Sequence, residues 1–232
     1  YAWDIDDGIR SKQEAAEALR IARDNGIVGI IATPHVIPGT HTVKDIQLFK
    51  RRLYELRVLA HKYHIGVFEG CELFLNHDYL DALKENVFIP VEDTHYLMVE
   101  FDVRKQIGEP YEVEEYLYEI TMRGYKPIIA HAERYPVIRK NLEHLEQLVD
   151  MGAYIQMNAD SISGVEGWGM KRFCKKVMKQ NLLHFVGSDA HNTGDRKPQM
   201  GRCAQYMEKT MGREYADKIL IRNPREIIEE GR

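Results

Sequence analysis

The chain reads Gly26-Ile27-Val28-Gly29-Ile30-Ile31-Ala32-Thr33-Pro34-His35 directly after a helix that we expect to begin at the capping box Ser11-Lys12-Gln13-Glu14. Gly26 ends that helix, and the apolar run from residue 27 to residue 32 is typical of a strand buried on both faces. His35 comes just after the strand. This order of helix, buried strand and polar side chain recurs along the chain. It predicts an α/β fold with parallel strands, because helices connect them.

Six short apolar runs are expected to be strands, at residues 27–32, 67–71, 96–99, 128–130, 154–157 and 184–187. Helices are expected at residues 43–63, 112–123, 141–150 and 168–179, with more toward the C-terminus. The last of these would begin with Asn223 as N-cap and Pro224 at the first helical position. Two architectures fit: a closed βα barrel without its first strand, and an open doubly wound sheet. No linker or repeat divides the 232 residues, so residues 1–232 are interpreted as a single domain.

Side chains that bind metals follow five of the six expected strands, and only the strand that ends near Asn158 lacks one. In chain order these side chains are His35, Glu72, Glu100, His131, Asp189 and His191. Active sites of barrels and doubly wound sheets lie at the carboxyl ends of the strands, so we expect these groups to meet at one rim. Crowded carboxylates repel one another unless cations neutralise them. Nitrogen and oxygen ligands in this number predict two or three divalent ions of manganese, iron or zinc.

Two arginines lie close to this rim in the sequence. Arg134 follows His131 by three residues, and Arg196 follows His191 by five. Arginine is suited to bidentate contact with phosphate, although both side chains also suit surface salt bridges. Four further histidines are left out of the predicted site because none follows a strand: His41, His77, His95 and His184.

Composition excludes several classes of protein. A net charge of −4 and a pI near 6.2 give no electrostatic reason to expect nucleic acid as a partner. No apolar run approaches the ~18 residues that a membrane span needs, so no membrane insertion is expected. The three cysteines, Cys71, Cys174 and Cys203, have no zinc or redox spacing, which favours reduced thiols in the cytoplasm.

Three stretches together resemble the PHP (polymerase and histidinol phosphatase) superfamily. They are Asp4-Ile5-Asp6-Asp7-Gly8, Ile129-Ala130-His131-Ala132-Glu133-Arg134-Tyr135 and Ser188-Asp189-Ala190-His191-Asn192. More narrowly, the chain is similar to the capsular and exopolysaccharide tyrosine phosphatases of that superfamily. The resemblance implies a distorted (β/α)7 barrel, two or three divalent metals that are commonly Mn²⁺, and a phosphorylated tyrosine kinase of polysaccharide synthesis as protein substrate.

The resemblance also implies roles for individual residues. It assigns Glu72, Glu100 and His131 to one metal. It assigns Asp7, His35 and His191 to a second metal, and Glu72 with Asp189 to a third. It further implies that Arg134 and Arg196 bind the substrate phosphate and that Asp189 or His191 assists proton transfer. The family opens with a strand of pattern Asp-x-His-x-His before the Asp-Asp-Gly stretch, and Tyr1 falls after it, so we expect that first strand and its ligands to be absent from this sequence.

Two alternatives stay open at the level of sequence. A histidinol-phosphatase-like enzyme, or another small-molecule phosphoesterase, would share the metals and the chemistry but have a different pocket. A non-catalytic regulatory PHP domain would keep the fold without the activity. No cysteine lies in a Cys-x5-Arg loop, so a cysteine-based phosphatase is not expected.

Overall fold

The computed structural model of the chain describes residues 1–102 and 110–231. The strands are β1 Gly29–Ala32, β2 His35–Val36, β3 Gly66–Glu69, β4 Glu72–Phe74, β5 Tyr96–Glu100, β6 Lys126–Ile129, β7 Tyr154–Asn158 and β8 Phe185–Gly187. The longer helices are α1 Lys12–Asp24, α2 Val43–His61, α4 Pro110–Met122, α6 Leu142–Asp150, α8 Trp168–Lys179, α9 Gly201–Met211 and α11 Asn223–Glu230. Shorter helical segments are α3 Tyr79–Glu85, Ala132–Arg134, α5 Pro136–Lys140, α7 Ala159–Ser163, α10 Arg213–Asp217 and Lys218–Arg222.

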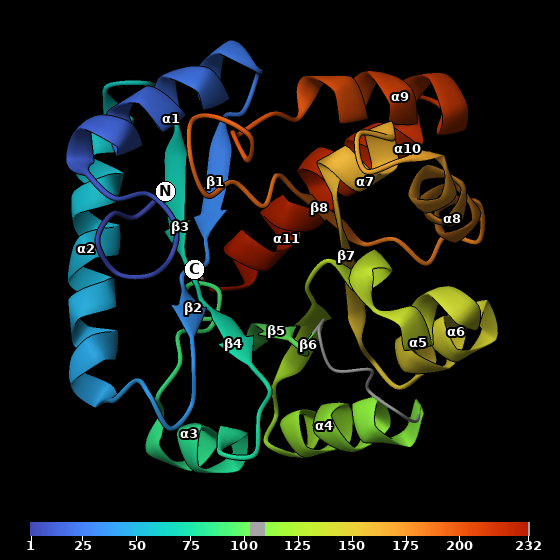
Figure 1. Cartoon of the computed structure of the whole chain (residues 1–232), viewed down its shortest axis with the longest axis horizontal. Helices are drawn as coiled ribbons and strands as arrows, with labels where there is room; N and C mark the ends of the chain where they lie inside the picture. The colour runs from blue at the N-terminus through green and yellow to red at the C-terminus, as the bar shows by residue number, and fades with distance from the viewer. Residues whose placement is uncertain (103–109, 232) are drawn as a thin grey trace.

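All paired strands are parallel, and their order follows the chain. One sheet pairs β1 with β3, and the other has the order β2-β4-β5-β6-β7-β8. Gly29 lies opposite Gly66 and His35 lies opposite Glu72, so β1–β2 and β3–β4 are two interrupted strands that keep one register. The result is a curled half-barrel with helices around it (Figure 1).

The predicted parallel α/β fold is confirmed, and the strand order, which never reverses, does not fit the doubly wound alternative. Within residues 1–102 and 110–231, β1 and β8 are not paired with each other. The closed (β/α)7 barrel and the absent first strand therefore stay predictions.

Most expected elements are found within a few residues of their predicted ends, but the strand at residues 67–71 and the N-cap at Asn223 are wrong. The strand expected at residues 67–71 breaks at Gly70 and Cys71, because the Cys71 thiol turns to accept a hydrogen bond from Ile89 N, so Glu72 begins β4 and does not simply follow a strand. Asn223 is not an N-cap, since the chain is already helical before it and its Nδ2 donates to the backbone oxygen of His184 at 2.8 Å. Ser11 is confirmed as the N-cap of α1, because its Oγ accepts from the backbone nitrogen of Glu14, but the Glu14 carboxylate accepts from Arg10 N and does not complete the capping box.

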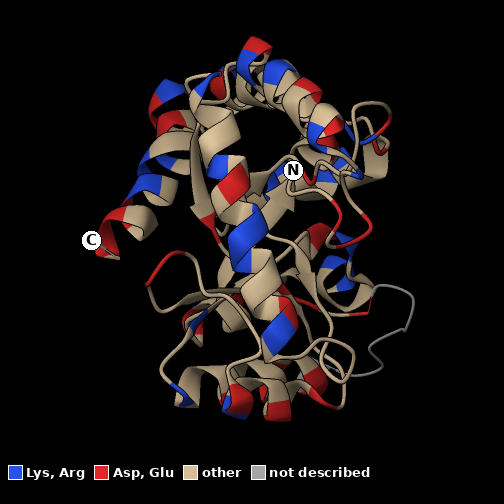
Figure 2. Ribbon diagram, turned by 90° about the vertical axis from the view of Figure 1, so that its left-hand side faces the viewer, with Lys and Arg blue, Asp and Glu red and all other residues tan. Residues whose placement is uncertain are grey.

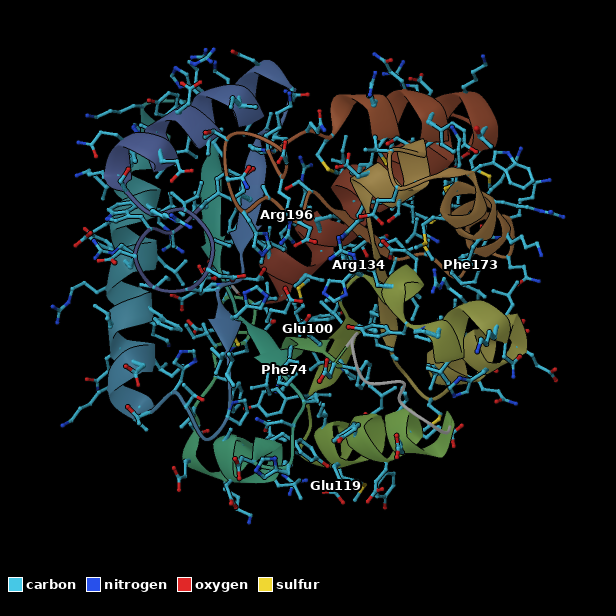
Figure 3. All side chains as sticks on the ribbon, viewed as in Figure 1. Phe74, Glu100, Glu119, Arg134, Phe173 and Arg196 are labelled. Atoms are coloured by element: carbon cyan, nitrogen blue, oxygen red, sulfur yellow. The ribbon has the colours of Figure 1, made fainter. Side chains whose placement is uncertain are left out.

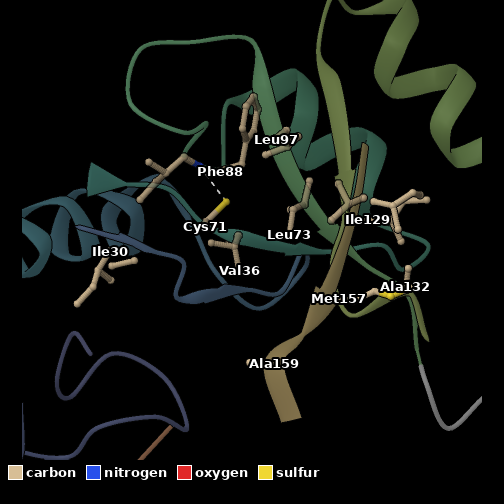
Figure 4. Close-up of a cluster of buried hydrophobic side chains, with 14 of the residues drawn as sticks. Ile30, Val36, Cys71, Leu73, Phe88, Leu97, Ile129, Ala132, Met157 and Ala159 are labelled. Atoms are coloured by element: carbon tan, nitrogen blue, oxygen red, sulfur yellow. Dashed lines mark hydrogen bonds between the residues drawn. The ribbon is translucent and has the colours of Figure 1, made fainter. Parts of the chain in front are cut away.

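The main core lies between the sheet and the surrounding helices. Val36, Leu73, Leu97, Ile129 and Met157, each from a different strand, are fully buried in it (Figure 4). Burying side chains of this size contributes about 1.5–3 kcal/mol each, which fixes the strands against their helices.

A smaller core closes one end of the curl. Ile227 of α11 packs there with Ile128 and Phe185, and Glu230 pairs with Lys126 at 2.8 Å. Because Lys126 is the first residue of β6, α11 lies at the amino ends of the strands. The opposite rim, formed by the carboxyl ends of the strands, is where active sites of such folds lie.

Basic and acidic residues alternate along the helices in Figure 2, and among the residues described there no basic stripe stands out. No described helix combines the length and the apolar character that crossing a membrane requires.

Candidate metal centre and phosphate site

His35 joins the N-terminal segment to the rim. Its Nδ1 lies 3.1 Å from Asp7 Oδ1 and 3.5 Å from Asp6 Oδ2, and its Nε2 lies 3.8 Å from Glu100 Oε2. The backbone nitrogen of His35 also donates to Asp6 Oδ2 at 3.1 Å, and Gly8 N donates to Asp6 Oδ1 at 3.0 Å. Asp6 thus fixes the loop that carries Asp7 beside the start of β2.

His131 stands at the end of β6 between two carboxylates. Its Nε2 lies 2.8 Å from Glu72 Oε1 and 3.4 Å from Glu100 Oε1. Its backbone has a φ of +34°, a conformation that non-glycine residues rarely adopt, and its N–H donates to Gln156 Oε1. Glu100 therefore lies within reach of both His35 and His131.

Two groups of side chains bring their ligand atoms within 4.8 Å of one another, as a metal ion requires: Asp7, His35 and His191, and His35, Glu72 and Glu100. His131 adjoins the second group through both glutamates. Six of the predicted metal ligands thus lie in these groups or next to them, and the seventh, Asp189, has its Oδ1 3.5 Å from His191 Nδ1. A cavity of about 1080 Å³ opens beside them, with the three histidines in its lining.

Negative charge dominates this cluster. Burial alone would lower the pKa of His35, but the contact with Asp6 and the charges of Glu72 and Glu100 outweigh it and raise that pKa to about 9. Burial would likewise lower the pKa of His131, and Glu100 and Glu72 raise it to about 10. Protons on the imidazoles thus balance the carboxylates, which is the role that divalent cations would take. The nitrogen and oxygen donor set fits such ions.

Asp189 belongs to a neighbouring cluster. Its Oδ2 lies 3.0 Å from Arg134 Nη1 and 2.8 Å from Arg196 Nη2, and it accepts from Asn158 Nδ2 at 2.8 Å. Burial would raise the pKa of Asp189, but Arg196 and Arg134 outweigh it and lower that pKa. Its backbone φ of +49° is again in the left-handed region. The metal-ligand role of Asp189 stays a prediction, whereas the two arginines do converge on one point.

Figure 3 shows Glu100, Arg134 and Arg196 in the central region that the helices surround, whereas Glu119 lies at the periphery on α4. The guanidinium groups of Arg134 and Arg196 both contact Asp189 Oδ2, so the two side chains reach one anionic oxygen.

Sequence reasoning missed several supporting residues. Asp6 was visible only as a neighbour of Asp7, and Asn158 lies at the end of the one strand that was set aside. Tyr135 Oη lies 3.2 Å from His131 Nδ1 and accepts from Phe101 N. Glu166 pairs with Arg134 at 3.0 Å and has no sequence signal at all.

The histidines left out of the site have other partners in the structure. The Nδ1 atoms of His41 and His184 accept hydrogen bonds from the backbone nitrogens of Ile37 and Ile155. His77 is exposed beside Asp78, and the backbone oxygen of His95 accepts from Lys126 N. Among the described residues, none of the four is in a metal-binding group.

Comparison with known proteins gives the cluster a context. The sequence model of the family "Capsular polysaccharide synthesis, CpsB/CapC" matches residues 3–229. The tyrosine-protein phosphatase CpsB of Streptococcus pneumoniae is 29% identical over 97% of this chain and 94% of its own length. The tyrosine-protein phosphatase YwqE of Bacillus subtilis is 31% identical over 90% of this chain and 82% of its own length. A solved structure from work on YwqE and CpsB, described as metal-dependent tyrosine phosphatases, covers 100% of this chain and 92% of its own with a TM-score of 0.83 and 28% identity.

Proposed function

This chain belongs to the CpsB/CapC family of capsular polysaccharide synthesis, and we propose that it is a metal-dependent tyrosine-protein phosphatase. The observation that carries the proposal is the cluster of carboxylates and imidazoles at the strand ends, directly beside two converging arginines. Relatives that span nearly the whole chain are tyrosine-protein phosphatases, which supports the same substrate class here.

The proposed metal ligands fall into three groups, one for each ion. Asp7, His35 and His191 would hold one divalent ion, and Glu72, Glu100 and His131 a second. A third ion would use Glu72 and Asp189. The ions, of which Mn²⁺ suits this donor set, would activate water and neutralise charge on the phosphoryl group.

Side chains of this chain would bind the phosphoryl group and transfer the proton. Arg134 and Arg196 would bind the phosphoryl oxygens and hold phosphorus in line with the attacking water. Asn158 keeps Asp189 between the two arginines through its 2.8 Å hydrogen bond. Asp189 or His191 would serve the proton transfer to the leaving tyrosine oxygen, because both adjoin the arginines or the metal groups.

Cysteine chemistry does not compete with this route. Cys71, Cys174 and Cys203 are all buried. Burial raises the pKa of Cys71 and of Cys203 to about 12, so neither thiol is ionised at neutral pH. A cysteinyl-phosphate intermediate is therefore not part of the proposal.

The protein substrate that fits the family is a phosphorylated tyrosine kinase of capsule or exopolysaccharide synthesis. The family's role in capsular polysaccharide synthesis and the tyrosine phosphatase activity of the relatives support this choice. A flat protein segment also suits a site whose arginines are partly exposed, at 31% for Arg134 and 41% for Arg196.

The test compares a phosphotyrosine peptide with histidinol phosphate as substrates, each with Mn²⁺ and with EDTA. We expect hydrolysis of the peptide with Mn²⁺ and none with EDTA. His131→Ala should abolish it, and His77→Ala, which removes an exposed histidine, should not. Activity that survives EDTA would refute metal dependence. Preference for histidinol phosphate would point to the small-molecule alternative, and no turnover of either substrate by the metal-loaded chain would favour a regulatory domain.

A further inference from the structure

The segment between α7 and α8 places a second carboxylate on Arg134. Glu166 Oε1 lies 3.0 Å from Arg134 Nη2, and Glu166 Oε2 accepts a hydrogen bond from Ser161 Oγ at 2.8 Å. Ser161 is fully buried, and its Oγ also lies 2.6 Å from Glu133 Oε1, so two carboxylates share the single hydroxyl hydrogen. Glu166 is therefore held by Arg134 through one oxygen and by a shared hydroxyl through the other.

Carboxylates contact both terminal nitrogens of the Arg134 guanidinium. Its Nη1 faces Asp189 Oδ2 at 3.0 Å while its Nη2 faces Glu166. A phosphoryl group that binds through both terminal nitrogens must take both of these positions, so at least one carboxylate has to leave.

Glu166 is the carboxylate that is easier to displace. Asp189 is only 12% exposed, lies two residues after β8 and has four side-chain partners, which are Arg134, Arg196, Asn158 and His191. The Glu166 side chain is 29% exposed and lies on a loop between Gly164 and Gly167. Gly164 ends α7 and Gly167 precedes α8, and both have positive φ, at +94° and +104°, so Glu166 lies outside both helices.

From this geometry we propose that Glu166 competes with the substrate phosphoryl group for Arg134 and thereby sets the affinity of the site for phosphate. The proposal rests on the proposed function, since it takes Arg134 as a phosphate-binding residue. A phosphate ester carries more negative charge than a carboxylate, so it displaces Glu166 on binding. When inorganic phosphate leaves, the carboxylate returns to the arginine, which assists product release.

The test is the substitution Glu166→Gln, which keeps the shape and removes the charge. We expect the Kd for inorganic phosphate, measured by calorimetry on the full chain, to fall about three- to tenfold. The KM for a phosphotyrosine peptide should fall by a similar factor, without a rise in kcat. Glu146→Gln removes an exposed carboxylate of α6 and makes the same change in net charge, so it should leave both constants unchanged.

Two outcomes would overturn the proposal. A higher KM and weaker phosphate binding in Glu166→Gln would show that Glu166 instead positions Arg134 for substrate. An unchanged Kd for phosphate and an unchanged KM for the peptide would show that Glu166 does not contact Arg134 in solution. The result also separates this inference from the proposed function. Tighter phosphate binding without hydrolysis of the peptide would refute only the function, whereas hydrolysis with unaltered phosphate affinity would refute only the inference.

Discussion

Replacing Tyr135 by phenylalanine tests whether His131 binds metal. Tyr135 is 1% exposed, and its hydroxyl oxygen accepts from Phe101 N at 3.1 Å and lies 3.2 Å from His131 Nδ1. If Nε2 of His131 binds a metal ion, Nδ1 must carry the proton and donate it to this oxygen. The hydroxyl then orients the imidazole toward the ion.

Tyr135→Phe should change two quantities separately, the free energy of unfolding and the affinity for metal. Loss of the partner of a buried backbone N–H costs about 1–3 kcal/mol in the free energy of unfolding. Loss of the hydrogen bond that orients a metal-binding histidine lowers metal affinity about 10- to 100-fold. The first effect arises at Phe101 and needs no metal, whereas the second arises only if His131 is a ligand.

Urea unfolding in EDTA measures the first effect, and calorimetric titration with Mn²⁺ measures the second. Tyr154→Phe is a matched control, because that hydroxyl pairs with the hydroxyl of Tyr96 at 3.4 Å and belongs to neither metal group. A Tyr135→Phe protein that is less stable but binds Mn²⁺ as tightly as the unaltered chain would refute the role of His131 as a ligand.

Three further predictions address the core, the pH dependence and the support of the site. Leu73→Ala should lower the free energy of urea unfolding by about 2–5 kcal/mol, since Leu73 is fully buried; a loss below 1 kcal/mol would contradict its place in the core. Burial, and then the charge of Lys218, lower the pKa of His184 to about 4, so the unfolded chain binds more protons below pH 6.5. Stability should therefore fall by up to about 3 kcal/mol as pH drops from 6.5 to 4, and a His184→Asn variant that falls just as steeply would count against this cause. In Gly187→Ala the new Cβ meets Gln156 Nε2, so the Gln156 side chain, which accepts from His131 N, should move and Mn²⁺ binding should weaken. In the control Gly169→Ala the new Cβ meets open space, so Mn²⁺ binding should be normal. Equal Mn²⁺ affinity in the two variants would refute the role of Gln156 in positioning His131.

The meeting of the metal-binding side chains was predictable because parallel strands end at one rim. His35, Glu100 and His131 follow separate apolar runs, and each run is a strand of the curled sheet. The interruption before Glu72 was not predictable, because it depends on a thiol contact with Ile89, far away in the sequence. Periodicity reports which residues are buried, but it does not report such long-range hydrogen bonds.

The residues that support the site were equally hidden for physical reasons. Asn158 has an amide, which is a weak signal for metal chemistry, and its importance lies in the hydrogen bond to Asp189. Glu166 lies on an irregular loop without any motif. Only the folded chain shows that it reaches Arg134.

The central claim is that the carboxylates and imidazoles at the strand ends bind divalent metal ions. Its most direct test is an anomalous difference map at the manganese edge from crystals of the chain grown with Mn²⁺. The account predicts peaks among Asp7, His35 and His191 and among Glu72, Glu100 and His131. A map from fully Mn²⁺-loaded crystals with no anomalous peak within bonding distance of these six side chains would contradict it.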